Sequence, residues 1–481
     1  MFRSVLAVVL LCTAGNAFAQ SETSDFARIG FAGFITTRAS DYQCVGVNPA
    51  NLGFIPQTDI FQLATPMGGG TERKRRSWSF TALEGGFSAS SDALTRSDLL
   101  DVIFQHSGTS FTIAQKQAAA EAFTNGGLRF NADVIAIGAA YQSQQFGGIA
   151  LTMRERATGT FVMNDEAANL IFLGKRSPYF DSIAVNWAGD SVAYARNTKY
   201  YSELFNGTVL SMLWFREYAA SYGLKVLDLR DVRVYAGVSV KFFESFAYLD
   251  ARVENASFAA RSALSPFFGI SYGKATTPSL VPGSSLAPIG TGWGLDVGVT
   301  VELDRWTFSA AVVDMGKMTF DGNVFTAGDT VLNGLTSTGF NSYNIFQEAQ
   351  KITGDGEFFK WQGLQSAHSA LPTRLKLGTM FFYGYRLQFG LDMVASLNTA
   401  TGSITQPIVS AGADYRITPW CKLGIGLGSG GNMGVFVPFS VMFSLFDGFW
   451  EMGVTSRDLV TYLVSKRPVV SLATGIMRFR L

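Results

Sequence analysis

The chain has 481 residues and a formal net charge of +1 at neutral pH, so it has no excess of positive charge to attract nucleic acid. Charged residues make up only 16% of the chain, whereas aromatic residues reach 14%, a balance that disfavours ordinary soluble domains. After residue 19 no run of about 18 apolar residues occurs, and the longest candidate, 435–446, carries Pro438, so only strands can cross a membrane.

The first predicted element is a secretory signal peptide at residues 1–19. Arg3 precedes an apolar run at 5–11, and residues 17–19 read Ala-Phe-Ala, which fits a small-x-small cleavage site. Lipoprotein processing at Cys12 is disfavoured by the bulky leucines before it. The mature protein is therefore expected to be exported.

Residues 20–77 form the next predicted unit, because they precede the first alternating segment and do not alternate themselves. Apolar residues such as Phe34 and Leu52 argue against disorder here. A wide barrel leaves an open lumen, so we expect a hatch folded inside it; a periplasmic tail is the alternative. The basic run 73–76 is expected to be a solvated periplasmic anchor, or else to attract anionic lipid headgroups or a partner protein.

From residue 78 to the last residue, apolar and polar side chains alternate with the two-residue period of a β-strand. The clearest case is 385–397, where Tyr385, Leu387 and Phe389 share an apolar face opposite Arg386 and Asp392. The pattern recurs at 78–90, 128–141, 148–157, 232–240, 295–303, 374–381, 409–417 and 477–481. The region 159–225 is harder to interpret and contains helix-like stretches such as 209–222.

Alternation alone would also fit a soluble sandwich, so the lengths of the connections discriminate between the two folds. Very short connections are expected at 304–305, 383–384, 418–420 and 447–448. Long ones are expected between them, at 274–291, 316–372, 398–406 and 458–467. Outer-membrane barrels sort short turns and long loops in this way.

We therefore predict an all-β fold: a transmembrane antiparallel β-barrel of about 14 strands (14–16) over residues 78–481, with an N-terminal hatch and some helical insertions in the loops. The protein is expected to be integral to the outer membrane and to have membrane lipid around it. Charged residues of the inward faces are expected to keep the lumen hydrated and rigid.

Enzymatic chemistry has little support in the sequence. The two histidines, His106 and His368, fall in predicted loops and have no Ser, Cys or carboxylate pattern that would build a triad. Neither histidine has a ligand-type partner at metal-binding spacing. We expect a protein that is not an enzyme and that has no catalytic residue, metal or cofactor.

The hatch region contains the motif Asn48-Pro49-Ala50-Asn51, for which a structural role is favoured over ligand contact. Pro49 holds Asn48 extended and starts a turn that the asparagine side chains cap. Cys44 and Cys421 are the cysteines left after cleavage, and an oxidising compartment allows a disulfide that tethers hatch to barrel; two buried free thiols are the alternative.

Candidate ligand contacts lie in two places. In the hatch they are Phe34 and the motif residues Asn48, Pro49, Ala50 and Asn51. In the long loop before residue 372, the aromatic candidates are Phe340, Phe346, Phe358, Phe359 and Trp361, which could line an apolar pocket or anchor the protein at the membrane interface.

Asn48-Pro49-Ala50 near the mature N-terminus, followed by a barrel that fills the remaining chain, resembles the outer-membrane long-chain fatty-acid transporter (FadL-type) superfamily. The segment 235–243, Tyr-Ala-Gly-Val-Ser-Val-Lys-Phe-Phe, looks like the strand that these proteins write Gly-x-Ser-x-Lys-Tyr. The likeness is greatest to uncharacterised Bacteroidota barrels, although Asn51 stands where the family usually has Gly. The resemblance implies a 14-stranded barrel with an N-terminal hatch.

The function that this resemblance implies is passive uptake of small hydrophobic, fatty-acid-like molecules through a hatch-plugged barrel. The alternative is a non-transporting barrel that serves as a scaffold or shuttle in protein secretion or surface assembly. The expected partners are therefore outer-membrane lipid, a hydrophobic small molecule, and secretion or assembly proteins, but no nucleic acid.

Overall fold

The computed structural model describes residues 27–53, 77–95, 97, 110–124, 126–254, 257–343, 348, 353, 358–384, 386–431, 434–464 and 469–481. The predicted signal peptide, the basic run 73–76, His106 and Phe346 lie outside the described residues. Within these residues, no helix is both long and apolar enough to span a membrane.

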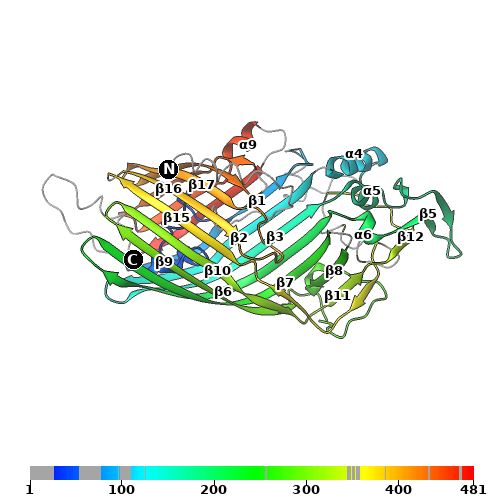
Figure 1. Cartoon of the computed structure of the whole chain (residues 1–481), viewed down its shortest axis with the longest axis horizontal. Helices are drawn as coiled ribbons and strands as arrows, with labels where there is room; N and C mark the ends of the chain where they lie inside the picture. The colour runs from blue at the N-terminus through cyan, green and yellow to red at the C-terminus, as the bar shows by residue number, and fades with distance from the viewer. Residues whose placement is uncertain are drawn as a thin grey trace.

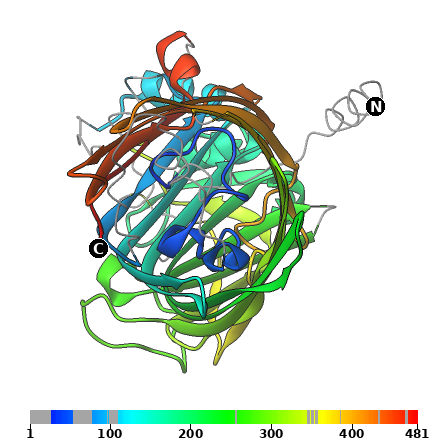
Figure 2. The ribbon, with the colours of Figure 1, turned by 90° about the vertical axis from the view of Figure 1, so that its left-hand side faces the viewer.

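Fourteen antiparallel strands of the described chain close into one barrel, which confirms the predicted fold class and strand number (Figures 1 and 2). Ring closure is made by the first and last strands, whose register runs from Ser79 opposite Arg480 to Ser90 opposite Val469. Around the ring the strands are β1 Trp78–Ser91, β2 Gly127–Ser143, β3 Gly147–Val162, β6 Val209–Asp228, β7 Val232–Glu254, β9 Gly290–Leu303, β10 Trp306–Phe320, β15 Arg374–Tyr383, β16 Leu387–Ser396, β17 Ile408–Thr418, β18 Cys421–Gly430, β20 Phe439–Leu445, β21 Trp450–Ser456 and β22 Val469–Arg480.

As predicted, the short turns lie at one end of the barrel and the long loops at the other. Short turns join β2 to β3, β6 to β7, β9 to β10, β15 to β16, β17 to β18 and β20 to β21 at one end, and the long connections lie at the other. By the rule for outer-membrane barrels, the end with short turns is periplasmic and the opposite end is extracellular. The prediction of a helix-like stretch at 209–222 is wrong, because β6 runs through it.

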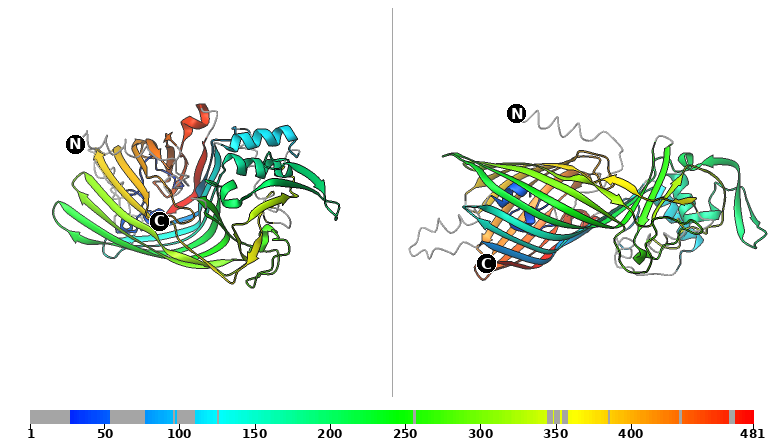
Figure 3. Two further views of the ribbon diagram at one scale, coloured as in Figure 1. Left: turned by 45° about the vertical axis from the view of Figure 1, so that its right-hand side comes forward. Right: turned by 90° about the horizontal axis from the view of Figure 1, so that it is seen from below.

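The long connections form an extracellular part beyond the barrel mouth (Figure 3). The outer half of β7 leaves β9 and pairs with β8, which continues to β11 and β13, while β14 pairs with β10. These added strands are β8 Ser257–Leu264, β11 Val324–Gly328, β13 Trp361–Gly363, β14 Ala367–Ala370 and β19 Val435–Phe436, and a separate three-stranded sheet contains β4 Ser182–Val185, β5 Ser191–Tyr200 and β12 Val331–Leu335.

Helices are short and belong to the connections or to the lumen. The α-helices are α4 Ile113–Thr124, α5 Asp165–Leu173, α6 Tyr201–Leu204 and α9 Leu459–Val464, and the 3-10 helices are η1 Asp41–Cys44, η2 Pro49–Leu52, η4 Gly174–Arg176 and η5 Pro266–Phe268. The helical loop insertions expected from the sequence are therefore present.

The outer wall is apolar over the height of a membrane. On β9 the exposed side chains Trp293, Leu295, Val297, Val299 and Leu303 alternate with glycines and with the buried polar residues Asp296, Thr300 and Glu302. Strand rise and tilt make the distance from Trp293 to Leu303 about 25 Å along the membrane normal, the height of the apolar band of outer-membrane barrels. The two-residue period therefore marks a face toward lipid and a face toward the lumen.

The substitution Val299→Arg tests this orientation. Val299 lies midway along the apolar band of β9, and an arginine at the bilayer midplane costs about 2–4 kcal/mol of folding free energy. Urea titration of the barrel folded in phospholipid vesicles should show a loss of that size. Val226→Arg, an exposed position close to the periplasmic turn between β6 and β7, is the matched control and should cost less than about 1 kcal/mol. Equal losses at both positions would contradict the assigned membrane position.

Candidate functional site in the barrel lumen

Residues 27–53, which we call the luminal segment, lie inside the barrel (Figure 2). All but Gly33 and Gly53 are buried. The segment contains the short helices η1 and η2 and contacts strands on both sides of the ring, from β2 and β7 to β16 and β22.

The Asn-Pro-Ala-Asn motif builds the turn at η2. The Asn48 carboxamide oxygen accepts the backbone N–H of Ala50 at 3.1 Å and so caps the helix, while Pro49 occupies its first turn. The Asn48 amide donates to Thr300 Oγ1 on β9 at 2.9 Å, and the Asn51 amide donates to the Ala39 carbonyl at 2.8 Å. Each of these contacts holds the fold of the segment or its place on the wall.

Glycines of the lumen face make room for the luminal segment. A Cβ added at Gly237 or Gly298 would overlap Pro49 or Asn48, and one added at Gly390 would overlap the ring of Phe34. Because any larger residue at these positions would displace the segment, the wall and the segment are shaped for each other. The sequence alone does not reveal this packing, because the glycines and the luminal segment are far apart along the chain.

Two carboxylates of the wall accept backbone N–H groups of the segment. Asp392 on β16 accepts the backbone N–H groups of Ile35 and Thr36 at 2.6 and 2.8 Å and the Thr36 hydroxyl at 2.9 Å. Glu84 on β1 accepts the Tyr42 hydroxyl at 2.7 Å and the Ile29 backbone N–H at 3.2 Å. Hydrogen bonds to ionised acceptors are stronger than neutral ones, so these two residues anchor the segment.

A third anchor joins the segment to the last strand. Asp41 in η1 accepts Arg478 Nη2 at 2.7 Å and Arg480 Nη2 at 3.1 Å, both on β22. Since Tyr42 and Gln43 bind Glu84 on β1, the short helix η1 contacts both strands of the closing seam.

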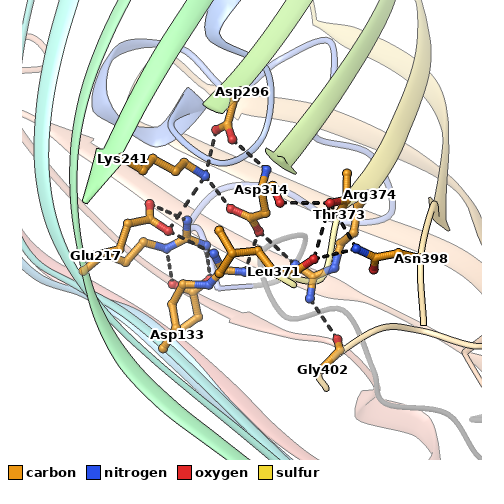
Figure 4. A network of polar contacts seen from close by, with 12 residues as sticks. Asp133, Glu217, Lys241, Asp296, Asp314, Leu371, Thr373, Arg374, Asn398 and Gly402 are labelled. Atoms are coloured by element: carbon orange, nitrogen blue, oxygen red, sulfur yellow. Dashed lines mark hydrogen bonds and ion pairs between the residues drawn. The ribbon is translucent and has the colours of Figure 1, made fainter. Parts of the chain in front are cut away.

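Above the segment, a network of buried ion pairs crosses the lumen (Figure 4). The charged members come from β2, β3, β6, β7, β9, β10, β15 and the luminal segment. They are Arg28, Asp133, Arg154, Arg156, Glu217, Lys241, Asp296, Asp314 and Arg374. The pair of Arg156 Nη2 with Asp314 Oδ2, at 2.9 Å, spans from β3 to β10 although three strands separate them along the wall.

Asp314 pairs with three cations of this network. Its oxygens lie 2.6 Å from Lys241 Nζ, 2.9 Å from Arg156 Nη2 and 3.4 Å from Arg374 Nη1. Asp314 stands in a β-bulge of β10 with φ at 60°, a left-handed conformation that is unfavourable for a residue with a side chain. The bulge shifts the alternation of lumen-facing and lipid-facing side chains by one residue. As a result, the neighbours Val313 and Asp314 are both buried.

The loop between β16 and β17 folds into the mouth of the barrel over this network. Thr401 and Ile404 are buried, and the Gly402 carbonyl accepts Arg374 Nη2 at 3.2 Å. Asn398 holds the loop by donating to the Leu371 carbonyl at 2.7 Å and accepting the Ser403 hydroxyl at 2.9 Å.

The aromatic candidates of the long loop lie in the core of the extracellular part. Phe340, Phe358, Phe359 and Trp361 are all buried in one apolar cluster. The ring centroids of Tyr201, Phe205 and Phe258 lie 5.1–5.6 Å from that of Phe359, distances typical of packed aromatic pairs. The cluster is a packed core of the extracellular part.

The remaining candidates are far apart in the fold. Cys44 and Cys421 are free thiols, so the suggested tether is not formed; Cys44 packs against residues of β2 and β3, whereas Cys421 begins β18. His368 does not lie in a loop as expected, because it belongs to β14, where its Nδ1 is 3.1 Å from Thr319 Oγ1.

For some residues the position in the lumen could be predicted from the sequence, and for others it could not. Lys241, Asp296 and Arg374 alternate with apolar neighbours and could be assigned to the lumen by their period. Asp314 could not, because its bulge breaks the period, and Arg28 could not, because it lies in a segment without regular structure.

Comparison with known proteins finds a family and a set of similar solved structures. None of the curated proteins compared matches the chain. The solved structures include the Pseudomonas putida toluene transporter TodX (10% identity, 97% of this chain and 99% of that one, TM-score 0.43) and the Ralstonia pickettii toluene transporter TbuX (9%, 96% and 99%, 0.42).

A Pseudomonas aeruginosa FadL homologue is also similar, at 10% identity over 96% of this chain and 98% of that one with a TM-score of 0.37, in agreement with the expected FadL-type resemblance. Because these TM-scores are low, the barrel is assigned from the strand pairing of this chain and not from the likeness. The likeness to Bacteroidota barrels stays a prediction. The model of the "Family of unknown function (DUF5723)" matches residues 74–447. The chain therefore belongs to that family.

Proposed function

We propose that the protein is an outer-membrane channel for passive uptake of small hydrophobic, fatty-acid-like molecules, with the luminal segment as its hatch. The observation that carries the proposal is a closed barrel whose lumen is filled by a non-covalently held segment of the same chain. Such a segment can leave its place without breaking the barrel, because the ring closes through β1 and β22 and not through the segment.

The extracellular aromatic cluster supports an apolar cargo. Aromatic side chains bury large areas and are the main lining of sites for apolar ligands. On this proposal, the loops that bury the cluster around Phe359 open to admit cargo, which then passes the hatch once the hatch has moved. Phe34 and the Asn48–Asn51 turn contribute by holding the closed state.

A reversible lock on the hatch tests the proposal. The atoms that a Cβ at Gly298 would overlap are Oδ1 and Cγ of Asn48, and the substitution N48C removes both. The double variant N48C/G298C therefore relieves the overlap and places two thiols where a disulfide can join η2 to β9. In cells lacking other fatty-acid channels of the outer membrane, the oxidised variant should take up radiolabelled oleate no faster than cells without the protein. Reduction should restore uptake, and the reduced form of the same variant is its own control.

A second candidate function, a scaffold for secretion or surface assembly, is favoured by one feature of the extracellular part. The hairpin of β4 and β5 presents a fully exposed Trp187 in a turn that Asn186 holds through hydrogen bonds from the backbone N–H groups of Ala188 and Asp190. Exposed tryptophans are common anchors of protein interfaces. Uptake that is absent in the wild-type protein, together with co-purification of partners that W187A abolishes, would replace the channel proposal with this one.

A further inference from the structure

The extracellular loop 397–407 and the luminal segment are connected by unbroken polar contacts. The Gly402 carbonyl binds Arg374, Arg374 binds Asp314 at 3.4 Å, and Asp314 binds Arg156 at 2.9 Å. The contacts continue through Glu217, Arg154 and Asp133 to Arg28 of the luminal segment, with distances given below. We call this series the luminal relay; Figure 4 shows its part from Gly402 to Asp133.

Each carboxylate of the luminal relay is shared between at least two cations. Glu217 lies 2.9 Å from Arg156 Nη1 and 3.4 Å from Arg154 Nη1. Asp133 accepts Arg154 Nε at 2.6 Å and lies 3.4 Å from Arg28 Nη1. All these groups are buried, so water screens their interactions weakly and a change at one cation is felt by the next.

The order of charges determines the direction of the effect. When Gly402 leaves, Arg374 turns its freed donor toward Asp314, and Asp314 then holds Arg156 less tightly. Arg156 binds Glu217 more tightly, Glu217 releases Arg154, and Arg154 takes more of Asp133. The last step weakens the contact of Asp133 with Arg28.

We propose that the luminal relay couples the extracellular loop to the luminal segment, so that moving the loop off Arg374 loosens the segment from the wall. The strained bulge at Asp314 is the junction, because its carboxylate joins the loop side to the hatch side of the network. By thermodynamic reciprocity, release of the segment also frees the loop. The coupling does not depend on the proposed transport of any cargo.

Cys44 is a built-in reporter for this coupling. It lies in η1, its side chain is fully buried, and it becomes accessible only when the segment moves. The measurement is the alkylation rate of Cys44 by iodoacetamide in the full-length C421S protein folded in vesicles, followed by mass spectrometry. Arg374→Gln removes a cation that competes with Arg156 for Asp314, so by the same order of charges it should lower the rate at least about fivefold, the lower range of coupling between linked sites.

Two further variants separate coupling from general damage. Asn398→Ala loosens the loop and leaves every luminal charge in place, so it should raise the rate, opposite to Arg374→Gln. Lys199→Gln is the control: Lys199 pairs with Glu166 at 2.6 Å in the extracellular part and belongs neither to the loop nor to the luminal relay, so its rate should match the parent protein.

A double-mutant cycle completes the test. In an Asp133→Asn background, where the link to Arg28 is cut, Arg374→Gln should change the rate much less than it does alone, because both act on one series of contacts. A parent-like rate for both R374Q and N398A, a rise in R374Q, a rise in K199Q equal to that in N398A, or multiplicative effects in the cycle would overturn the proposal. Since no cargo is used, these outcomes are independent of whether uptake occurs.

Discussion

Gly237→Leu should turn a closed barrel into a conducting one. An added Cβ at this position already overlaps the backbone of Pro49 and Ala50, and backbone atoms cannot turn aside as a side chain can. Overpacking of this kind costs about 1–3 kcal/mol, and the luminal segment can avoid that cost by leaving the wall. In planar bilayers the variant should show frequent ion-conducting openings that the wild-type protein lacks.

The neighbouring residue provides the control for Gly237→Leu. Ala236 lies next to Gly237 on β7, but its side chain points to the lipid face, where a leucine is well accommodated. Ala236→Leu should therefore conduct like the wild type. If G237L stayed silent while its folding was intact, the luminal segment would not be what closes the lumen.

Arg154→Met should destabilise the barrel more than any surface substitution. Arg154 is 1% exposed and binds both Asp133 and Glu217. Its removal takes away a positive charge with which both buried carboxylates pair. Breaking a buried ion pair in this way costs about 3–5 kcal/mol of folding free energy. Urea unfolding of the barrel in vesicles, followed by tryptophan fluorescence, should show the loss.

An exposed ion pair gives the comparison for Arg154→Met. Lys199 and Glu166 form a pair at 2.6 Å in the extracellular part, with side chains 45% and 40% exposed. Lys199→Met should cost no more than about 1 kcal/mol, because water already solvates both charges. A similar cost for the two variants would mean that the lumen around Arg154 is as wet as the surface.

Period-two alternation predicted the barrel because lipid outside and polar groups inside impose opposite demands on successive residues. The prediction for 385–397 holds in the described part of β16: Leu387, Phe389 and Leu391 face outward and Asp392 faces the lumen. It failed for 209–222, because the first residues of β6 are covered by loops on the outside as well as by the lumen. A strand that is buried on both faces loses its alternation.

The candidate site was harder to predict than the fold. Alternation places a charged residue in the lumen, but it says nothing about which charge on a distant strand will meet it, as Arg156 meets Asp314 across the barrel. The turn at Pro49 was readable from local chemistry. The glycines that accommodate it were not, since a glycine in a strand has the same appearance whether or not a second segment packs against it.

The contacts of η1 with β1 and β22 bear on how the barrel is assembled. The first and last strands are the farthest apart in the chain, so their pairing has the highest entropic cost and is the slowest contact to form. Asp41 holds Arg478 of one strand while its neighbour Tyr42 holds Glu84 of the other. The luminal segment, which precedes every strand in the chain, thus brings the two ends of the sheet together from inside the barrel. Ring closure and docking of the luminal segment therefore become one cooperative event.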